Sequence, residues 1–400
     1  MPPTAPSPQQ TACPFPVSSG PALNPEYAAL RRGPLPRVRL PHGGDAWLVT
    51  GYQDVRTVLS DARFSIVAPR DGEQPRMRSG ARAVSGLFAL DPPEHSRLRS
   101  VVGRNFTPRR VDMLRGRIAE LTSACLDRME AAGPPADLVA LLAAPVPPGV
   151  LCALMGVPEE NHGLFEDWAR LILSHEPRPD EMARKFEEFS ACLREMVARR
   201  RAGPSDDIIG TMVRACDEEG RISEDELYAV AADLLSAGFL STSDQLSVLV
   251  HALLAGPRRY TRLVERPDLI PAAIEEVLRH TPLLSAFSFP RYATEDVELG
   301  GVLVRAGEPV VPVVAAANHD PGVFPDPDRI DLDRDAAPHL AFGHGPHYCV
   351  GAQLARLELR VMTEALVSRF PRLTLAVPEE RLSWRTGHLL NGLVELPVTW

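Results

Sequence analysis

Apolar residues recur with helical spacing through most of the chain, which predicts a mainly helical fold. Residues 223–226, Ser-Glu-Asp-Glu, form a capping box that predicts the start of a long helix ending near residue 254. A second long helix is predicted from about residue 350 to residue 369. The other predicted helices are 53–60, 95–104, 110–131, 150–154, 161–173, 180–202, 206–217 and 270–280.

Shorter segments with alternating apolar residues predict a smaller β portion. Residues 46–49 and 292–314 predict short strands, and residues 372–398 predict terminal strands. Residues 65–90 show little periodicity, and a loop of that length in a compact domain is usually functional. The fold class predicted from the pattern is therefore mainly α with minor β.

Length and composition limit the domain organisation. The chain has 400 residues, 44% of them hydrophobic, which is ordinary for a globular protein with a large core. We expect a single domain over residues 21–400, preceded by a proline-rich, disordered tail at residues 1–20. The most apolar stretch, 227–254, is interrupted by Asp233 and Asp244, so it predicts a buried helix and no membrane span.

Charge and cysteine usage narrow the partners and the compartment. A net charge of −9 gives no reason to expect nucleic acid as a partner. The six cysteines are scattered and form no CxxC, a pattern that fits reduced thiols in a cytoplasmic protein. No secretory segment is visible near the N-terminus. We therefore expect a cytoplasmic protein with neither nucleic acid nor membrane as its partner.

Residues 342–356, FGHGPHYCVGAQLAR, carry the most specific chemistry in the chain. They place Cys349 at the end of a glycine-rich loop, directly before a predicted helix. Gly343, Gly345 and Gly351 let the backbone pass close to something flat and bulky. A helix N-terminus and free loop amides both lower the pKa of a thiol. A thiolate held in this way is a reactive nucleophile or a metal ligand.

This segment resembles the haem-ligand signature of the cytochrome P450 superfamily, of the soluble bacterial type. The resemblance implies one haem-thiolate domain with a long central helix over haem b, iron protoporphyrin IX. It makes Cys349 the axial thiolate, with Phe342 shielding the sulfur and His347 donating to a haem propionate. Gly343 and Gly351 match the glycines of the same signature.

Three further motifs agree with the resemblance and occur in the order of the family. His95-Ser-Arg-Leu-Arg99 has the i, i+4 spacing that aims two side chains at one target, and the resemblance assigns them to a propionate. Arg291 matches a third propionate partner. Glu276 and Arg279 form a Glu-x-x-Arg pair, which in the family is buried and joined by a second arginine. Arg329, in the segment Pro-Asp-Arg-Ile, matches that arginine.

The predicted long helix departs from the family at its centre. The stretch Ala237-Gly238-Phe239-Leu240-Ser241-Thr242 matches the family pattern Ala/Gly-Gly-x-Acid-Thr, with leucine at the acid position and serine at the threonine position. Gly238 costs about 1 kcal/mol in a helix interior, which we attribute to space for dioxygen or substrate. Ser241 and Thr242 are the candidate hydroxyls, and Asp244, one turn beyond Leu240, is a candidate displaced acid. Each of these residues also has a purely structural interpretation.

The departure leaves two hypotheses for the reaction. In the first, protons reach the oxygen through Ser241, water and the polar groups of the substrate. In the second, the substrate couples to itself or to a partner, so that a weakened proton relay is tolerated.

The resemblance implies that residues of two loops, two helices and the terminal strands contact the substrate. These candidate residues are Leu87, Phe88, Leu171, Leu234, Ala237, Ala286, Phe287 and Leu390, with Ser285, Ser288 and Asn391 as polar anchors. The lining is mainly apolar and suits a small or medium-sized natural product, including a peptide, with few polar handles.

The resemblance implies monooxygenation, with hydroxylation favoured, using dioxygen and two electrons. No flavin or iron–sulfur domain is recognised, so we expect a separate ferredoxin and ferredoxin reductase as electron donors. A basic cluster near the cysteine face would receive an acidic partner; its members are Arg104, Arg109, Arg110, Arg356 and Arg360. The alternatives are oxidative C–C, C–O or C–N coupling, a non-catalytic haem-based sensor, and a Cys349 nucleophile with His347 as its base.

Overall fold

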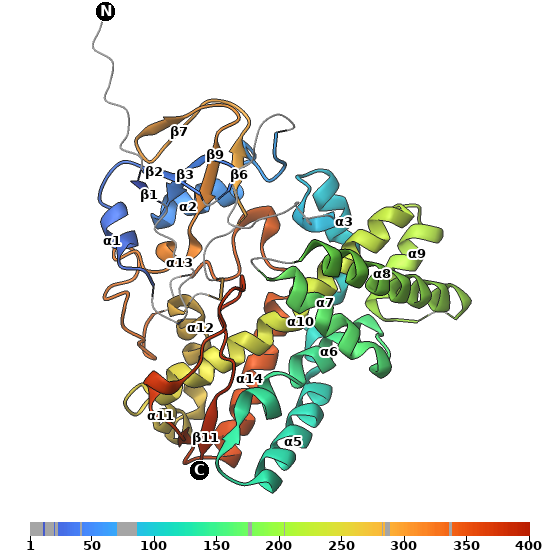
Figure 1. Cartoon of the computed structure of the whole chain (residues 1–400), viewed down its shortest axis with the longest axis vertical. Coiled ribbons are helices and arrows are strands. Elements are labelled where there is room, and N and C mark those ends of the chain that lie inside the picture. Colours follow the sequence, from blue (N-terminus) through green and yellow to red (C-terminus); the bar gives the residue numbers. More distant parts are fainter. Residues whose placement is uncertain are drawn as a thin grey trace, which may run out of the picture.

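The long helix α10, Glu224–Ala255, crosses the middle of the molecule (Figure 1). Both hydrogen bonds of the predicted capping box are present, because the Ser223 side chain accepts from the Glu226 backbone and the Glu226 side chain accepts from the Ser223 backbone. Arg97 pairs with Glu226 and lowers the pKa of that carboxyl to about 2. From Phe239 onward almost every α10 residue is buried, as expected for a helix that is surrounded by other helices.

The protein is represented by a computed structural model. It describes residues 11–12, 20, 23–40, 42–69, 86–174, 178–203, 205–281, 283–284, 289–335 and 338–400. Of the tail predicted at 1–20, only Gly20 and the strand β1 (Thr11–Ala12) are within these ranges, and β1 pairs in parallel with β2. None of the helices in these ranges is long and apolar enough to cross a bilayer.

Helices pack around α10 on several sides and form one large hydrophobic core with it. The longer ones are α3 (Glu94–Gly103), α5 (Arg115–Ala132), α6 (Val146–Met155), α7 (His162–Ile172), α8 (Pro179–Ala202), α9 (Ile208–Asp217), α12 (Ile270–His280) and α14 (Ala352–Arg369). The shorter ones are α1 (Glu26–Leu30), α2 (Tyr52–Ser60), α4 (Pro108–Asp112), α11 (Arg259–Glu265) and α13 (Val314–Ala317).

The β portion lies mainly at one end of the molecule, at the top of Figure 1. A six-stranded sheet has the order β1-β2-β3-β9-β6-β4 and a three-stranded sheet the order β10-β11-β5, while β7 and β8 form a hairpin. The strands are β2 (Arg37–Arg39), β3 (Asp45–Val49), β4 (Phe64–Ser65), β5 (Ala136–Asp137), β6 (Arg291–Ala293), β7 (Val297–Leu299), β8 (Val302–Val304), β9 (Pro309–Pro312), β10 (Thr374–Leu375) and β11 (Pro397–Thr399). Their residues are mostly β-branched or apolar, which suits buried strands.

The predicted mainly α fold with minor β is confirmed, and most predicted helices lie within a few residues of the observed ones. The helix predicted at 110–131 is interrupted after Asp112, so that α4 and α5 are separate. The short elements α1, β2 and α11 were not predicted. They are too short for a periodic pattern to distinguish them from loops.

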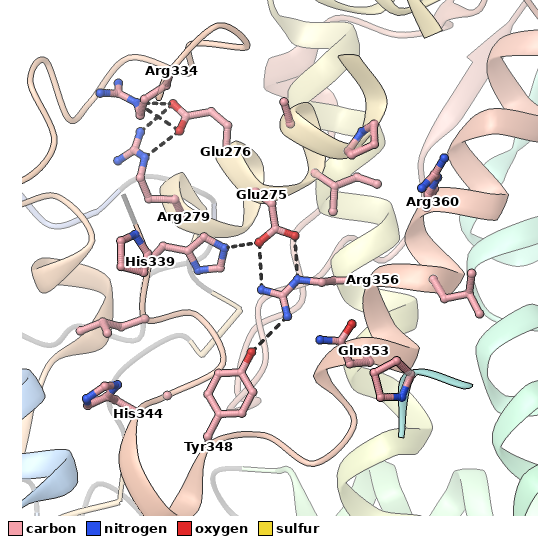
Figure 2. A pocket seen from close by; sticks show the side chains of 18 of the residues that line it. Glu275, Glu276, Arg279, Arg334, His339, His344, Tyr348, Gln353, Arg356 and Arg360 are labelled. Atoms are coloured by element: carbon pink, nitrogen blue, oxygen red, sulfur yellow. Dashed lines mark hydrogen bonds and ion pairs between the residues drawn. The ribbon is translucent and has the colours of Figure 1, made fainter. Parts of the chain in front are cut away.

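A buried ion-pair network ties the irregular segment after α13 to α12 (Figure 2). Arg279 donates to both carboxylate oxygens of Glu276 at 2.8 and 2.9 Å, and Arg334 donates to the same carboxylate at 3.0 and 3.1 Å. Arg279 also donates to the carbonyls of Asn318 and Pro327 at 2.8 and 2.9 Å. A single buried pair on a helix therefore also satisfies backbone carbonyls of a segment that has no helix or strand of its own.

The assignment of Arg329 to this network is wrong. Its side chain is 69% exposed and approaches only Asp331, at 3.8 Å, whereas its backbone carbonyl accepts from Arg279 and Arg334. Arg334, five residues later, supplies the second guanidinium because the chain bends between the two positions.

Replacing Arg334 should destabilise the protein and replacing Arg329 should not. Arg334→Gln removes charged hydrogen bonds to buried Glu276, which should cost about 1.5–3 kcal/mol in the free energy of unfolding. Arg329→Gln, the matched control, should stay within about 0.5 kcal/mol of the parent. Urea unfolding of the purified variants measures both, and equal losses would contradict the assignment.

Candidate functional site

The Cys349 loop is shaped by two glycines and ends on α14. Gly343 and Gly345 have φ of +76° and +70°, in the left-handed region of backbone conformation that favours glycine. A Cβ on Gly345 would also lie 2.4 Å from the Leu59 carbonyl oxygen, so this glycine serves close approach to α2. The Cys349 amide donates to the Phe342 carbonyl at 2.9 Å and closes the loop.

The electrostatics of Cys349 combine burial with positive neighbours. Part of its surface is accessible although most of its surroundings are protein, and the burial raises the pKa of the thiol. The Gly351 amide, Arg99, Arg356 and the Ala352 amide act in the opposite direction. A metal ion on the sulfur would reverse the balance, because a coordinating thiol is deprotonated.

A cluster of four nitrogen-bearing side chains, here termed the donor cluster, comes together from α3, β6 and the cysteine loop. Its members are His95, Arg99, Arg291 and His347. The rings of His95 and His347 lie 4.1 Å apart between centroids. Among the described residues, His95 Nδ1 and His347 Nε2 are buried without a hydrogen-bond partner.

No acidic side chain within the described ranges pairs with either arginine of the donor cluster. Arg291 is 5% exposed and donates to the Phe289 carbonyl at 3.0 Å, and burial lowers its pKa to about 10. Arg99 donates to the Tyr348 carbonyl at 2.6 Å. Burial is the largest cause that lowers the pKa of His347 to about 3, and the nearby His95 and Arg291 lower it further. Asp91 is the acid that acts on Arg291 and on both histidines, without a hydrogen bond or ion pair between its carboxylate and their side chains in the described part of the chain. Buried donors without a paired acid fit a bound dianion, such as the two propionates of haem.

Ala237 and Ser241 form an open stripe on α10. Ala237 is exposed and Ser241 half-buried, one turn apart, whereas Leu240 and Thr242 beside them are buried. Gly238 does not belong to this stripe. A Cβ at Gly238 would lie 3.1 Å from the Leu151 side chain of α6, so this glycine permits close packing of two helices. Its assignment to oxygen or substrate stays a prediction.

Thr242 contacts a buried acid that the sequence analysis missed. Glu358 of α14 is 2% exposed, and burial raises its pKa well above the usual value, against the hydrogen bond donated by Thr242. Burial therefore favours the uncharged form of this carboxyl. The available signal was an acidic residue on an apolar helix face, between Leu354 and Val361.

Asp244 is engaged in an ion pair, and burial raises its pKa to about 6 against the Arg385 guanidinium. Its role as a displaced acid stays a prediction. Arg385 donates to both of its carboxylate oxygens at 2.8 Å. A Cβ on Gly392 would lie 2.4 Å from the same carboxylate, and the Asn391 amide donates to Leu283 at 2.7 Å. Asp244 thus ties the segment that carries Leu390 to α10.

Asp233 fixes another candidate substrate segment three helical turns earlier. It accepts from the Leu87 amide at 2.7 Å and also from the amide of Phe88. Gly86 has φ +56°, and a Cβ there would lie 2.5 Å from the Asp233 carboxylate. Burial raises the pKa of Asp233 to about 7, against these two amides.

The remaining candidate substrate residues have mixed exposure. Leu87, Leu234 and Leu390 are buried, and Phe88 and Leu171 are half-buried. Phe88 contacts the Phe289 ring at 5.9 Å between centroids. Ser285, Ala286, Phe287 and Ser288 lie outside the described residues.

A cytochrome P450 family model matches residues 18–384. The chain belongs to the cytochrome P450 family. Mycinamicin IV hydroxylase/epoxidase of Micromonospora griseorubida is 45% identical over 396 residues, which cover 98% of this chain and 100% of that protein. Nocardicin C N-oxygenase of Nocardia uniformis subsp. tsuyamanensis is 47% identical over 381 residues, which cover 94% and 96%. A crystal structure of HinD with NMFT and NO has a TM-score of 0.94 at 44% identity, covering 98% and 100%.

Membership confirms the fold, the enzyme class and the cofactor. P450 enzymes bind haem b with a cysteine thiolate on the iron, and these relatives are monooxygenases. They use dioxygen, an organic substrate and electrons from redox partners. The protein is thus a cytochrome P450 oxidoreductase.

Arg291→Met should change stability and haem binding in opposite directions. The apoprotein should gain about 1–4 kcal/mol of unfolding free energy, because a buried cation without a counter-charge is replaced by an apolar side chain. Haem affinity should fall at least about 10-fold, since a propionate loses its partner.

Denaturant unfolding of the apoprotein and haem transfer to apomyoglobin measure the two effects. Arg305→Met, at an exposed ion pair with Asp296, is the control and should alter neither. A loss of stability in the Arg291→Met apoprotein would contradict the interpretation.

Asp233 should make stability depend on pH in a predictable direction. Its pKa rises from 3.8 to about 7 in the fold, so the folded state holds this proton more tightly and unfolding free energy falls as pH rises through that range. Asp233→Asn removes this loss. The stability of the variant relative to the parent should therefore rise by about 2–3 kcal/mol between pH 5 and pH 8. Urea titrations at each pH test this, and a constant difference would refute it.

Proposed function

We propose that this P450 inserts one oxygen atom into a small or medium-sized natural product, most readily by hydroxylation. The observation that carries the proposal is the donor cluster, whose arginines are paired with no acidic side chain of the described residues and whose histidines keep buried, unpartnered nitrogens beside the cysteine loop. The relatives named above support oxygen insertion, because their names describe hydroxylation, epoxidation and N-oxygenation of natural products. They do not favour oxidative coupling, and they argue against a non-catalytic haem sensor and a cysteine nucleophile.

Cys349 would hold the haem iron, and the donor cluster would hold the propionates. Phe342 lies at the start of the same loop, Gly343 lets the backbone turn with φ of +76°, and Gly351 is the N-cap of α14. Haem bound there supplies the oxidising chemistry with dioxygen and two electrons. The protein has to orient the substrate and exclude water.

Proton delivery would depend on hydroxyl groups of α10. Leu240 cannot carry a proton, whereas the Ser241 hydroxyl lies on the open stripe. Ser241 would pass protons from water and from polar groups of the substrate. Thr242 is directed to Glu358 and would stabilise that buried interface.

The substrate would lie against apolar side chains whose segments are held by two aspartates. Asp233 fixes Leu87 and Phe88, and Asp244 fixes the segment of Leu390. These contacts support an apolar ligand with few polar handles, because both carboxylates are already occupied by protein partners.

A ferredoxin with its reductase would supply the electrons. A cavity of about 650 Å³ opens beside the cysteine loop, and its lining includes Arg56, Arg115, Arg356 and Arg360. Arg360 pairs with Glu364, and Arg356 pairs with Glu275, so part of this charge is compensated. An acidic ferredoxin fits the remaining positive charge. The five described cysteines are unpaired, which fits a reducing cytoplasm.

The first test is the absorption spectrum of the reduced, CO-bound protein, followed by turnover. A Soret band at the position that names the family is expected for the parent and should be lost in Cys349→Ser. Turnover uses ferredoxin, its reductase, NADPH and the probes mycinamicin IV and nocardicin C. A product one oxygen atom heavier supports the proposal, whereas a dehydrogenated dimer would replace it with coupling.

Ser241→Ala should lower the fraction of electrons recovered in product by about 10-fold or more, because the stripe then lacks a hydroxyl. Ser243→Ala is the matched control, since this buried hydroxyl lies on the same helix and away from the stripe. Equal yields from both variants would exclude the role proposed for Ser241.

A further inference from the structure

Glu275 and Glu276 are neighbours on α12 that serve different networks (Figure 2). Whereas Glu276 binds Arg279 and Arg334, Glu275 binds Arg356 of α14 through both carboxylate oxygens, at 2.7 and 2.9 Å. His339 Nε2 lies 3.0 Å from the same carboxylate. Glu275 therefore connects α12 with the chain on both sides of the cysteine loop.

Arg356 in turn contacts both ends of that loop. Its guanidinium lies over the Phe342 ring, 4.4 Å from the centroid, and donates to the Tyr348 hydroxyl at 3.1 Å. The Phe342 carbonyl accepts the hydrogen bond from the Cys349 amide, and Tyr348 directly precedes Cys349. A planar, bidentate guanidinium suits this position, because its fork fixes its orientation while its face stacks on the ring.

The charges of this network act on the sulfur. Arg356 contacts both ends of the cysteine loop, and Arg99 donates to the Tyr348 carbonyl directly before Cys349, so both cations lie beside the segment that carries the sulfur. Glu275 stays ionised, because His339 and Arg356 outweigh burial and lower its pKa to about 2. The carboxylate therefore compensates part of the positive charge that Arg356 would otherwise direct at the sulfur.

We propose that Glu275 is a positioning residue that fixes Arg356 against the cysteine loop and sets the positive field at the Cys349 sulfur. Its effect is on the reduction potential of the bound haem. The inference rests on haem binding through Cys349 and is independent of which substrate is oxidised.

The experiment measures the reduction potential of the haem-loaded variants by spectroelectrochemical titration, with the reduced-CO band recorded on each sample. Glu275→Gln is nearly isosteric and should raise the reduction potential. Arg356 then loses its counter-charge, and the stronger positive field favours the reduced haem, which carries one more electron. Arg356→Gln should lower the potential, because a cation near the sulfur is removed. Both variants should keep the thiolate position of the CO band.

Arg360→Gln is the matched control. Arg360 lies one turn further along α14, borders the same cavity and pairs with Glu364. It should lower the potential less than Arg356→Gln does, although the change in net charge is the same. Tyr348→Phe keeps every charge and should leave the potential close to that of the parent.

A shift of the Glu275→Gln potential to a more negative value, or no shift, would overturn the proposal when the thiolate band is kept. If Glu275→Gln does not retain haem, Arg356→Gln decides: a decrease larger than that of Arg360→Gln supports the proposal, and an equal decrease overturns it. If the parent protein shows no thiolate band, Cys349 is refuted as the haem ligand. That outcome is distinct from a failure of the role proposed for Glu275.

Discussion

Burying positive charge without protein counter-charge is the constraint on which the site depends. Arg291 lies on β6 with a carbonyl as its partner, and the rings of His95 and His347, each with one unpartnered buried nitrogen, lie 4.1 Å apart between centroids. Desolvation of such groups is costly unless an anion arrives. The same residues that weaken the empty fold therefore favour a dianionic cofactor, so stability and cofactor affinity are opposed in one cluster.

Buried carboxylates on two helices hold long irregular segments against the helical core. Asp233 and Asp244 lie eleven residues apart on α10, close to three full turns, and each binds a different segment. Glu276 on α12 does the same for the chain after α13. Irregular backbone has donors and acceptors that no ladder satisfies, and a buried carboxylate can accept several of them at once.

Most features predictable from the sequence were encoded locally, and the long-range convergence of the donor cluster was implied by the family resemblance alone. Cys349 and its glycines, the capping box at Ser223 and the Glu276–Arg279 pair each depend on residues within one turn or one loop. Contacts between distant segments carry no periodic signal. Arg334 was missed because an irregular segment has no periodicity that shows which arginine points inward. Arg385 was missed because no residue near it in the sequence indicates that it pairs with Asp244.

Leu240 illustrates how packing limits the chemistry that a helix position can carry. It is 5% exposed, within the apolar core that α10 shares with its neighbours. A carboxylate at this position would need its own buried partner, as Asp233 and Asp244 have, or burial would raise its pKa, as it does for Glu358. The open stripe of Ala237 and Ser241 escapes this limit, because a hydroxyl there loses little hydration. The proposed route of proton transfer therefore uses an accessible alcohol and the groups around it in place of a buried acid.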